Sequence, residues 1–202
     1  MKSQSLPHTL GFTKNLLEMR IIAGKAGRIV IKVPSAVARP TTDFVRQAIF
    51  SILGVKIQDA RVLDLFCGSG ALGLEALSRG AASCVFIDDH RQAISVTEGN
   101  LIKARLDGGR TTRADAFSFL KRDTGSYDLI FADPPYWKNH GDIDHVQKLL
   151  ELSTLPERIS PFGHFIAEIS AHQTTPTSRH LRFLDRREYG SSAILIYSHL
   201  SQ

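Results

Sequence analysis

From Arg61 onward, short apolar segments alternate with stretches whose apolar residues recur at every third or fourth position. The apolar segments have the length of buried strands, and the other stretches have the period of amphipathic helices. This alternation predicts an α/β fold, in which a mostly parallel sheet is covered by helices on both faces. We expect strands at 62–66, 84–88, 110–113, 129–133, 164–169, 183–188 and 193–198, and helices at 71–79, 91–104, 116–121 and 144–152.

The pattern before Arg61 is different. Residues 1–18 show little periodicity and predict a flexible extension. Apolar residues spaced by three and four positions predict a helix that Thr41 or Thr42 caps and that Gly54 ends. The chain is therefore expected to consist of the extension (1–18), a small basic appendage (19–58, with a strand at 28–33, a loop at 34–40 and this helix) and a main domain (59–202).

Composition narrows the class of protein. With 202 residues, 43% of them hydrophobic and 22% charged, the chain has the composition of an ordinary globular domain. It has no run of the ~18 apolar residues that a membrane span needs and no secretory signal at its start, which favours a cytoplasmic protein. Its two cysteines, Cys67 and Cys84, do not have the spacing of metal ligands, so reduced thiols are expected.

The positive charge is concentrated in the first sixty residues. They contain nine Lys and Arg against three Asp and Glu, whereas residues 61–202 contain sixteen against seventeen. The net charge of +5 is therefore due to the N-terminal part of the chain. This asymmetry favours a basic appendage that meets a polyanion, and a solvated basic face without a partner is the alternative.

The glycine-rich segment VLDLFCGSGALG follows the first expected strand of the main domain. Gly68, Gly70 and Gly73 have the GxGxxG spacing, and Asp88 ends the next strand, as in nicotinamide-binding enzymes. Asp64 argues against such an enzyme, since a carboxylate beside the loop would repel a pyrophosphate. The same acid would attract the sulfonium and ammonium groups of S-adenosylmethionine, and Asp88 would accept hydrogen bonds from its ribose hydroxyls. A tight turn without a ligand is the alternative.

The segment FADPPYW ends a later strand of the same sheet. Asp133 and the carbonyl of Pro134 can each accept one N–H of an amino group on a nucleobase, which aims the nitrogen lone pair at the donor methyl group. The two prolines hold this backbone rigid, and Tyr136 offers a flat face on which an extruded base can stack. We therefore predict an amino-methyltransferase in which Asp133 supports the amine electrostatically. A rigid turn with a capping Asp is the alternative.

Several segments together resemble one known family. They are MRIIAGKAGR (19–28), RPTTDFVRQAIFSIL (39–53), VLDLFCGSGALGLEALSRGA (62–81), FID (86–88), YDLIFADPPY (127–136) and REYGSSAILIY (187–197). The resemblance is to the RsmD family of bacterial small-subunit ribosomal RNA guanine-N2 methyltransferases, and it runs from Met19 to the C-terminus. It implies a Rossmann-like class I methyltransferase fold, S-adenosylmethionine as the donor, and methylation of the exocyclic N2 of one guanine in 16S ribosomal RNA, at a guanine 966-type site.

The resemblance also implies partners and site residues. It implies a monomer that acts on 16S ribosomal RNA within the 30S subunit or an assembly intermediate, without a metal or a membrane. Either Asp88 or its neighbour Asp89 would hold the ribose. The site residues are Asp133, Pro134, Pro135 and Tyr136 for catalysis; Asp64, Phe66, Gly68, Gly70, Asp88 and Asp115 for the donor; and Arg20, Lys25, Arg28, Arg39, Thr41 and Thr42 for RNA.

Other readings stay open at this point. The acceptor could be a DNA adenine or a protein glutamine, and two further classes are a nicotinamide-dependent oxidoreductase and a non-catalytic RNA-binding module. The segment HGDIDH (140–145) contains residue types that bind metals, but we expect it to close over the substrate, because methyl transfer of this class needs no metal. Two alternatives remain for four basic side chains near the C-terminus, which could contact RNA phosphates or form a solvated face: Arg179, Arg182, Arg186 and Arg187.

Overall fold

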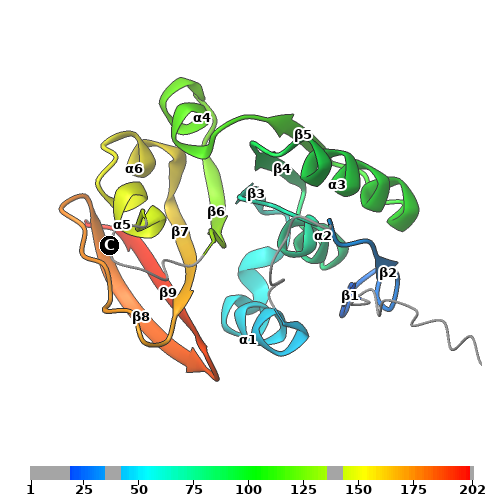
Figure 1. Ribbon diagram of the computed structural model, residues 1–202, viewed down its shortest axis with the longest axis horizontal. Coiled ribbons are helices and arrows are strands. Elements are labelled where there is room, and N and C mark those ends of the chain that lie inside the picture. Colours follow the sequence, from blue (N-terminus) through cyan, green and yellow to red (C-terminus); the bar gives the residue numbers. More distant parts are fainter. Residues whose placement is uncertain (1–18, 35–41, 136–142, 201–202) are drawn as a thin grey trace, which may run out of the picture.

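The computed structural model describes residues 19–34, 42–135 and 143–200, which form a seven-stranded sheet with helices on both faces and a two-stranded sheet beside it (Figure 1). The order of the large sheet is β5-β4-β3-β6-β7-β9-β8. The first five of these strands are parallel, and β9 is antiparallel to both of its neighbours. The predicted α/β class is therefore confirmed.

The bounds of the elements are as follows. The strands are β1 (Met19–Arg20), β2 (Val30–Ile31), β3 (Arg61–Leu65), β4 (Ser83–Asp88), β5 (Gly109–Arg113), β6 (Tyr127–Ala132), β7 (Ile159–Ser170), β8 (Leu181–Tyr189) and β9 (Ser192–His199). The helices are α1 (Asp43–Leu53), the 3-10 helix η1 (Gly54–Ile57), α2 (Ala71–Ser78), α3 (Arg91–Ala104), α4 (Ala116–Arg122), α5 (His145–Leu150) and α6 (Thr154–Arg158). None of the helices in these ranges is long and apolar enough to cross a membrane.

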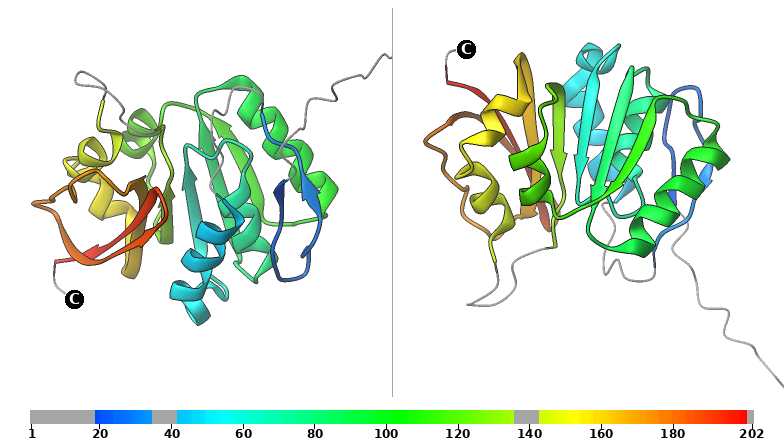
Figure 2. Two further views of the ribbon diagram at one scale, coloured as in Figure 1. Left: turned by 60° about the horizontal axis from the view of Figure 1, so that its bottom comes forward. Right: turned by 90° about the horizontal axis from the view of Figure 1, so that it is seen from above.

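The sheet separates two hydrophobic cores. Because side chains alternate between the faces of a strand, Val62 joins one core and Leu63 the other. The first core contains side chains of α1 and α2, and the second contains side chains of α4, α5 and α6. Figure 2 shows these two helical layers on either side of the sheet. A strand that is apolar at successive positions fits this arrangement, since both of its faces are buried.

The parallel strands end in register at one edge of the sheet. Leu65 of β3 lies beside Ile87 of β4 on one side and Ala132 of β6 on the other. The segments that follow these three residues therefore start next to one another. The order of strands also reverses between β3 and β6, because β4 and β5 lie on the far side of β3. In open α/β sheets, ligands bind in the crevice that such a reversal creates.

The N-terminal segment differs from the predicted strand at 28–33. Only Val30 and Ile31 are in β2, and they pair with β1, a strand that the sequence did not indicate. Between them the chain makes a turn in which Arg28 has a φ of 72°. Met19 and Ile31 are buried in the first core, together with residues of α2. The division of the chain into an appendage and a main domain at residue 59 stays a prediction.

The predicted helices are present, with one change in the second half. The Thr42 hydroxyl caps α1, and Gly54 ends this helix with a φ of 52°. The helix expected at 144–152 is shorter, because Asp144 is its N-cap and the helix ends at Leu150. A second short helix, α6, follows. It was not predicted, and its segment contains Pro156. Proline fits there because the first N–H groups of a helix have no partner within it.

Candidate cofactor and catalytic site

The glycine loop turns the chain from β3 into α2. Phe66, Gly68 and Gly70 have positive φ angles of 58°, 56° and 77°. A side chain at Gly70 would bring a Cβ atom within 2.8 Å of Cγ2 of Thr97 on α3. At Gly73 it would come within 2.3 Å of the Phe86 ring. These glycines let the loop and α2 lie directly against their neighbours, which is the role that glycines have in nucleoside-binding loops.

Asp64 lies beneath the loop and is only 1% exposed. Its carboxylate accepts the backbone N–H of Gly73 at 2.9 Å. Burial raises the pKa of Asp64 to about 7; the hydrogen bond from Gly73 opposes this rise, and the negative charge of Asp88 adds to it. The side chain thus connects β3 to the first turn of α2. Because it is buried, it would act on a bound donor through its charge and not through direct contact.

Asp88 is the acid that reaches the glycine loop. Its Oδ2 accepts the N–H of Gly68 at 2.9 Å, and its Oδ1 accepts the N–H of His90 at 2.9 Å. Each carboxylate oxygen can accept a further hydrogen bond, so two hydroxyls could still bind. Asp89 is exposed, and its backbone carbonyl accepts Nε of Arg113. This geometry favours Asp88 over Asp89 as the acid that would hold a ribose.

The residues predicted for catalysis follow β6. Asp133 is half-buried, Pro134 is buried and Pro135 is exposed. Ala132 of β6 pairs with Leu65 of β3, so the next residue, Asp133, lies beside the start of the glycine loop. The two prolines also line a small hollow with residues of α5 and of the end of β7. Tyr136 lies outside the described residues, so its predicted stacking role stays a prediction.

An aromatic cluster lies next to the predicted adenine contact, Asp115. The ring of Phe66 is 6.2 Å from that of Phe117 and 5.5 Å from that of His145, measured between centroids. Nζ of Lys148 lies 4.4 Å from the centroid of Phe117. Burial, followed by the charge of Lys148, lowers the pKa of His145. Phe66 was predicted as a donor contact, whereas Phe117 and His145 were not; α5 brings His145 here from a distant part of the chain.

Asp115 itself caps a helix. Its Oδ1 accepts the N–H of Ser118 at 2.9 Å at the start of α4. Partial burial acts to raise its pKa, but the hydrogen bonds from Ser118 and the charge of Lys148 outweigh it and lower the pKa of Asp115. This carboxylate therefore stays ionised at neutral pH and, being exposed, could still accept a hydrogen bond from an amino group.

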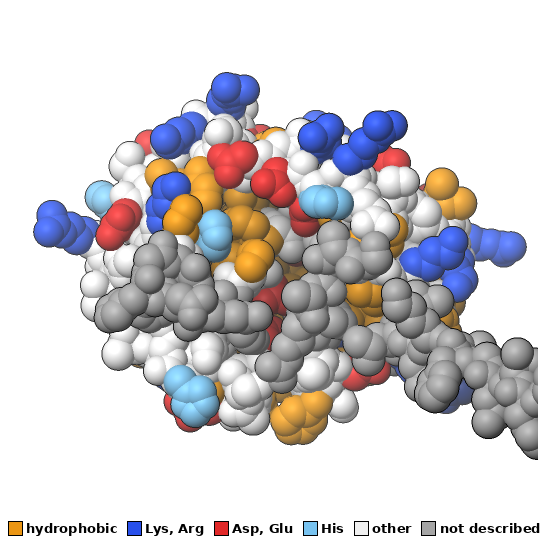
Figure 3. Space-filling model, in the orientation of Figure 1, with side chains coloured by type: hydrophobic (Ala, Val, Ile, Leu, Met, Phe, Trp, Pro, Cys, Tyr) orange, Lys and Arg blue, Asp and Glu red, His pale blue; other side chains and the backbone are white. Residues whose placement is uncertain are grey.

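The predicted RNA-binding residues that the structure describes are all exposed: Arg20, Lys25, Arg28 and Thr42. Arg39 and Thr41 lie outside the described residues. Figure 3 shows one face of the molecule, with Lys and Arg side chains along its upper, left and right edges and acidic and apolar side chains nearer the centre. Such a distribution would suit a ligand whose phosphates meet the rim while a base enters the centre.

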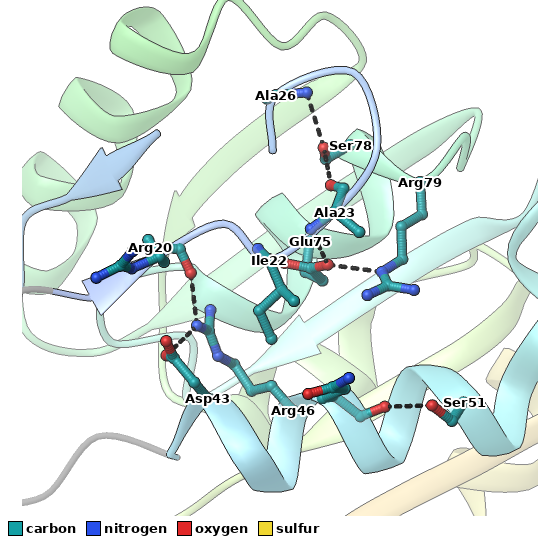
Figure 4. A network of polar contacts seen from close by, with 11 residues as sticks. Arg20, Ile22, Ala23, Ala26, Asp43, Arg46, Ser51, Glu75, Ser78 and Arg79 are labelled. Carbon is teal, nitrogen blue, oxygen red and sulfur yellow. Dashed lines mark hydrogen bonds and ion pairs between the residues drawn. The ribbon is translucent and has the colours of Figure 1, made fainter. Parts of the chain in front are cut away.

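Arg46 connects α1 to this basic segment and was not predicted. It is fully buried, and its Nη2 donates to the carbonyl of Arg20 at 2.6 Å and to Oδ1 of Asp43 at 2.7 Å (Figure 4). Its position in the helical period, on the side of Ile49 and Phe50, gave no sign of this role, because arginine is seldom buried.

Two of the C-terminal arginines have partners within the chain. Arg186 donates to the carbonyls of Ala171 and Gln173 and to Glu188, which joins β8 to the turn that follows β7. Arg187 pairs with Asp185 at 2.8 Å. Arg186 therefore has a structural role, and its contact with RNA phosphates stays a prediction.

Metal ligands do not gather in the described part of the chain, where no three His, Cys, Asp or Glu side chains could hold one ion. Residues 140–142 of the HGDIDH segment lie outside it. His145, the last residue of that segment, packs its ring against Phe66 and Phe117 instead.

The sheet order, the glycine loop at the reversal point and the acid and prolines after β6 define a Rossmann-like class I methyltransferase fold. A family model described as "Conserved hypothetical protein 95" matches residues 19–198. The chain belongs to this family, which is the RsmD family that the sequence motifs indicated.

Individual relatives agree with this assignment. The chain is 38% identical to the Bacillus subtilis protein YlbH over 89% of this chain and 98% of that protein. It is also 38% identical to the Escherichia coli "Ribosomal RNA small subunit methyltransferase D", over 66% of this chain and 67% of that protein. Among solved structures, the Escherichia coli protein yhhF has a TM-score of 0.76 and 31% identity, covering 92% of this chain and 99% of that one.

Proposed function

We propose that this protein transfers a methyl group from S-adenosylmethionine to the exocyclic N2 of one guanine in 16S ribosomal RNA, at the site that the family resemblance implies. The observation that carries the proposal is the shared register of β3, β4 and β6. It brings the glycine loop, Asp88 and Asp133 to neighbouring strand ends, so that a donor and an acceptor could meet there.

The residues around the glycine loop fit the donor. The positive φ of Gly70 and the absence of a side chain there let the loop make its tight turn against Thr97 of α3, and a nucleoside would meet the backbone of this loop. Asp88 would accept the ribose hydroxyls, and Asp115 would accept from the adenine amino group beside Phe66. Bound S-adenosylmethionine supplies a methyl carbon that the amine attacks, and the electron pair of the broken C–S bond returns to sulfur.

Asp133 and Pro134 would hold the amine. The carboxylate and the proline carbonyl each accept one N–H of the guanine N2, which turns its lone pair out of conjugation and toward the methyl carbon. Positive charge develops on this nitrogen during transfer, and the carboxylate of Asp133 stabilises it. The nitrogen then loses one proton to solvent water, which leaves a neutral N2-methylguanine.

The proposed partner is small-subunit RNA, within the 30S subunit or an assembly intermediate, met by the protein as a monomer in the cytoplasm. Two observations support RNA. Arg20, Lys25 and Arg28 are exposed on the N-terminal segment, and a relative at 38% identity has a name that refers to the small ribosomal subunit. Basic side chains on one segment suit contacts to phosphates.

The test is a transfer assay with labelled S-adenosylmethionine. The substrate is small ribosomal subunits that lack the native modification, and duplex DNA is the control acceptor. Asp133→Ala should bind the donor and transfer no label, whereas Asp107→Ala, which removes an exposed acid from a loop, should transfer at the wild-type rate. Label in DNA alone, or an active Asp133→Ala variant, would refute the proposal.

A further inference from the structure

Asn100 on α3 joins two separate segments through one amide group. Its side chain is 1% exposed. Oδ1 accepts the N–H of Lys32 at 2.8 Å, and Nδ2 donates to the carbonyl of Lys32 at 2.9 Å. The second hydrogen of Nδ2 goes to the carbonyl of Ser69, also at 2.9 Å. The Asn100 amide thus forms two hydrogen bonds with the backbone of Lys32, as the backbone of a neighbouring strand would, and a third with the glycine loop.

Thr97 supports the same loop from one turn earlier on α3. Its hydroxyl donates to the carbonyl of Gly68 at 3.2 Å, and its side chain is fully buried. Residues three apart lie on the same side of a helix, which is why Thr97 and Asn100 reach successive carbonyls of the loop. These bonds fix the peptide planes on either side of Ser69. The N–H of Gly68 then points at Asp88, the predicted ribose ligand.

The N-terminal segment is also bound to α2, the helix that follows the loop. Glu75 is fully buried, and its carboxylate accepts the N–H groups of Ile22 and Ala23 at 2.6 and 3.0 Å (Figure 4). Ser78, one turn later, accepts the N–H of Ala26 at 2.9 Å. The segment that presents the basic side chains is therefore bound to both helices that flank the loop.

We propose that Asn100 is a positioning residue that couples the N-terminal segment to the glycine loop, so that RNA and the methyl donor bind cooperatively. The RNA half of this inference rests on the proposed function. RNA that contacts Arg20, Lys25 and Arg28 restricts the motion of the segment, and through Asn100 it restricts the loop. The donor then binds a loop whose remaining motion is already reduced, and linkage requires the donor to strengthen RNA binding by the same factor.

The experiment measures two affinities on three proteins. The dissociation constant of S-adenosylhomocysteine is measured by calorimetry on the free protein. The dissociation constant of small ribosomal subunits that lack the modification is measured by filter binding, without and with saturating S-adenosylhomocysteine. The proteins are the wild type, Asn100→Leu and the matched variant Thr97→Val, which loses a loop contact but none to Lys32.

The wild type should bind subunits at least about fivefold more tightly when S-adenosylhomocysteine is saturating. Thr97→Val should bind S-adenosylhomocysteine more weakly and keep that ratio. Asn100→Leu should bind it more weakly and show a ratio near one. If Asn100→Leu does not fold, Asn100→Asp replaces it, because it keeps the acceptor for Lys32 but loses both donated hydrogen bonds.

A wild-type ratio of one, or an unchanged ratio in the Asn100 variant, would overturn the coupling. These outcomes differ from a failure of the proposed function. If the subunits bind and accept methyl groups but the ratio is one, only the coupling is wrong. If no protein binds the subunits, the RNA assignment is wrong as well, while calorimetry still reports whether Asn100 positions the loop.

Discussion

The carboxylate of Asp88 accepts the backbone N–H of Gly68 at 2.9 Å, which joins the end of β4 to the glycine loop that follows β3. The two residues are 20 positions apart, and the parallel pairing of β3 with β4 brings them together. A loop held in this way presents its backbone, and the acid beside it, in a restricted range of arrangements. Such preorganisation lowers the cost of ordering a ligand site when the ligand binds.

The first prediction concerns donor affinity. Asp88→Ala removes the loop contact and the predicted ribose acceptor, and hydrogen bonds to a charged group contribute about 1.5–3 kcal/mol each. The affinity for S-adenosylhomocysteine should fall by about tenfold to a hundredfold, as measured by calorimetry. Asp89→Ala is the matched control and should bind as the wild type does. An equal loss in both variants would contradict the choice of Asp88.

The second prediction concerns the packing of α2 on β4. In Gly73→Ala, the new Cβ would lie 2.3 Å from the Phe86 ring and 2.5 Å from Sγ of Cys84. Overpacking of a buried site costs about 1–3 kcal/mol, so the midpoint of urea unfolding should fall. Gly99→Ala on α3 is the control, since no atom lies within 4 Å of the new Cβ there. It should raise stability by about 0.5–1 kcal/mol. A neutral Gly73→Ala would mean that the helix can move away from the sheet.

The third prediction concerns pH. Burial raises the pKa of Asp64 to about 7 in the folded protein, whereas an unfolded Asp has a pKa of about 3.9. Between these values the folded state binds more protons than the unfolded state, so this group makes stability fall as pH rises from about 4 to about 7. The loss approaches at most about 4 kcal/mol and does not grow further above pH 7.

Asp64→Asn isolates this effect, because the amide carbonyl can still accept the N–H of Gly73 and does not titrate. The free energy of unfolding is measured in urea at pH 5, 6, 7 and 8 for both proteins. The wild type should lose stability relative to the variant as pH rises. A constant difference across this range would show that Asp64 does not titrate there.

The fourth prediction concerns the N-terminal segment. Glu75→Gln leaves one acceptor oxygen where the carboxylate had two, and it removes the charge that pairs with Nε of Arg79 at 2.6 Å. Breaking a fully buried pair costs about 3–5 kcal/mol, and the cost here should be smaller because the Arg79 side chain is 23% exposed. Hydrogen exchange should become faster at the amides of Ile22 and Ala23, while the amides of β6 stay protected. Uniformly faster exchange would instead indicate global destabilisation.

The sequence was sufficient to predict the parts of the fold that depend on local pattern. The apolar strands, the turn at Gly68 and Gly70 and the cap at Thr42 follow from period, conformation and hydrogen bonding within a few residues. The motif at Asp133 could also be placed, because the carboxyl ends of parallel strands share one edge.

The remaining features depend on contacts between distant segments. Lys32 and Asn100 are 68 positions apart, and nothing near either residue indicates that they pair. Arg46 and Glu75 lie on helix faces that are otherwise apolar, and the backbone groups of the N-terminal segment that pair with them come from a distant part of the chain. Burial of a polar group is decided by what packs over it, which the local pattern does not contain.

The most direct measurement of the central claim is the identity of the methylated nucleoside. Small ribosomal subunits lacking the modification are incubated with the protein and S-adenosylmethionine, and their RNA is digested and analysed by mass spectrometry. The account predicts N2-methylguanosine at a single position, formed by the wild type and absent with Asp133→Ala. Methylation of another base, or N2-methylguanosine that persists in the Asp133 variant, would contradict it.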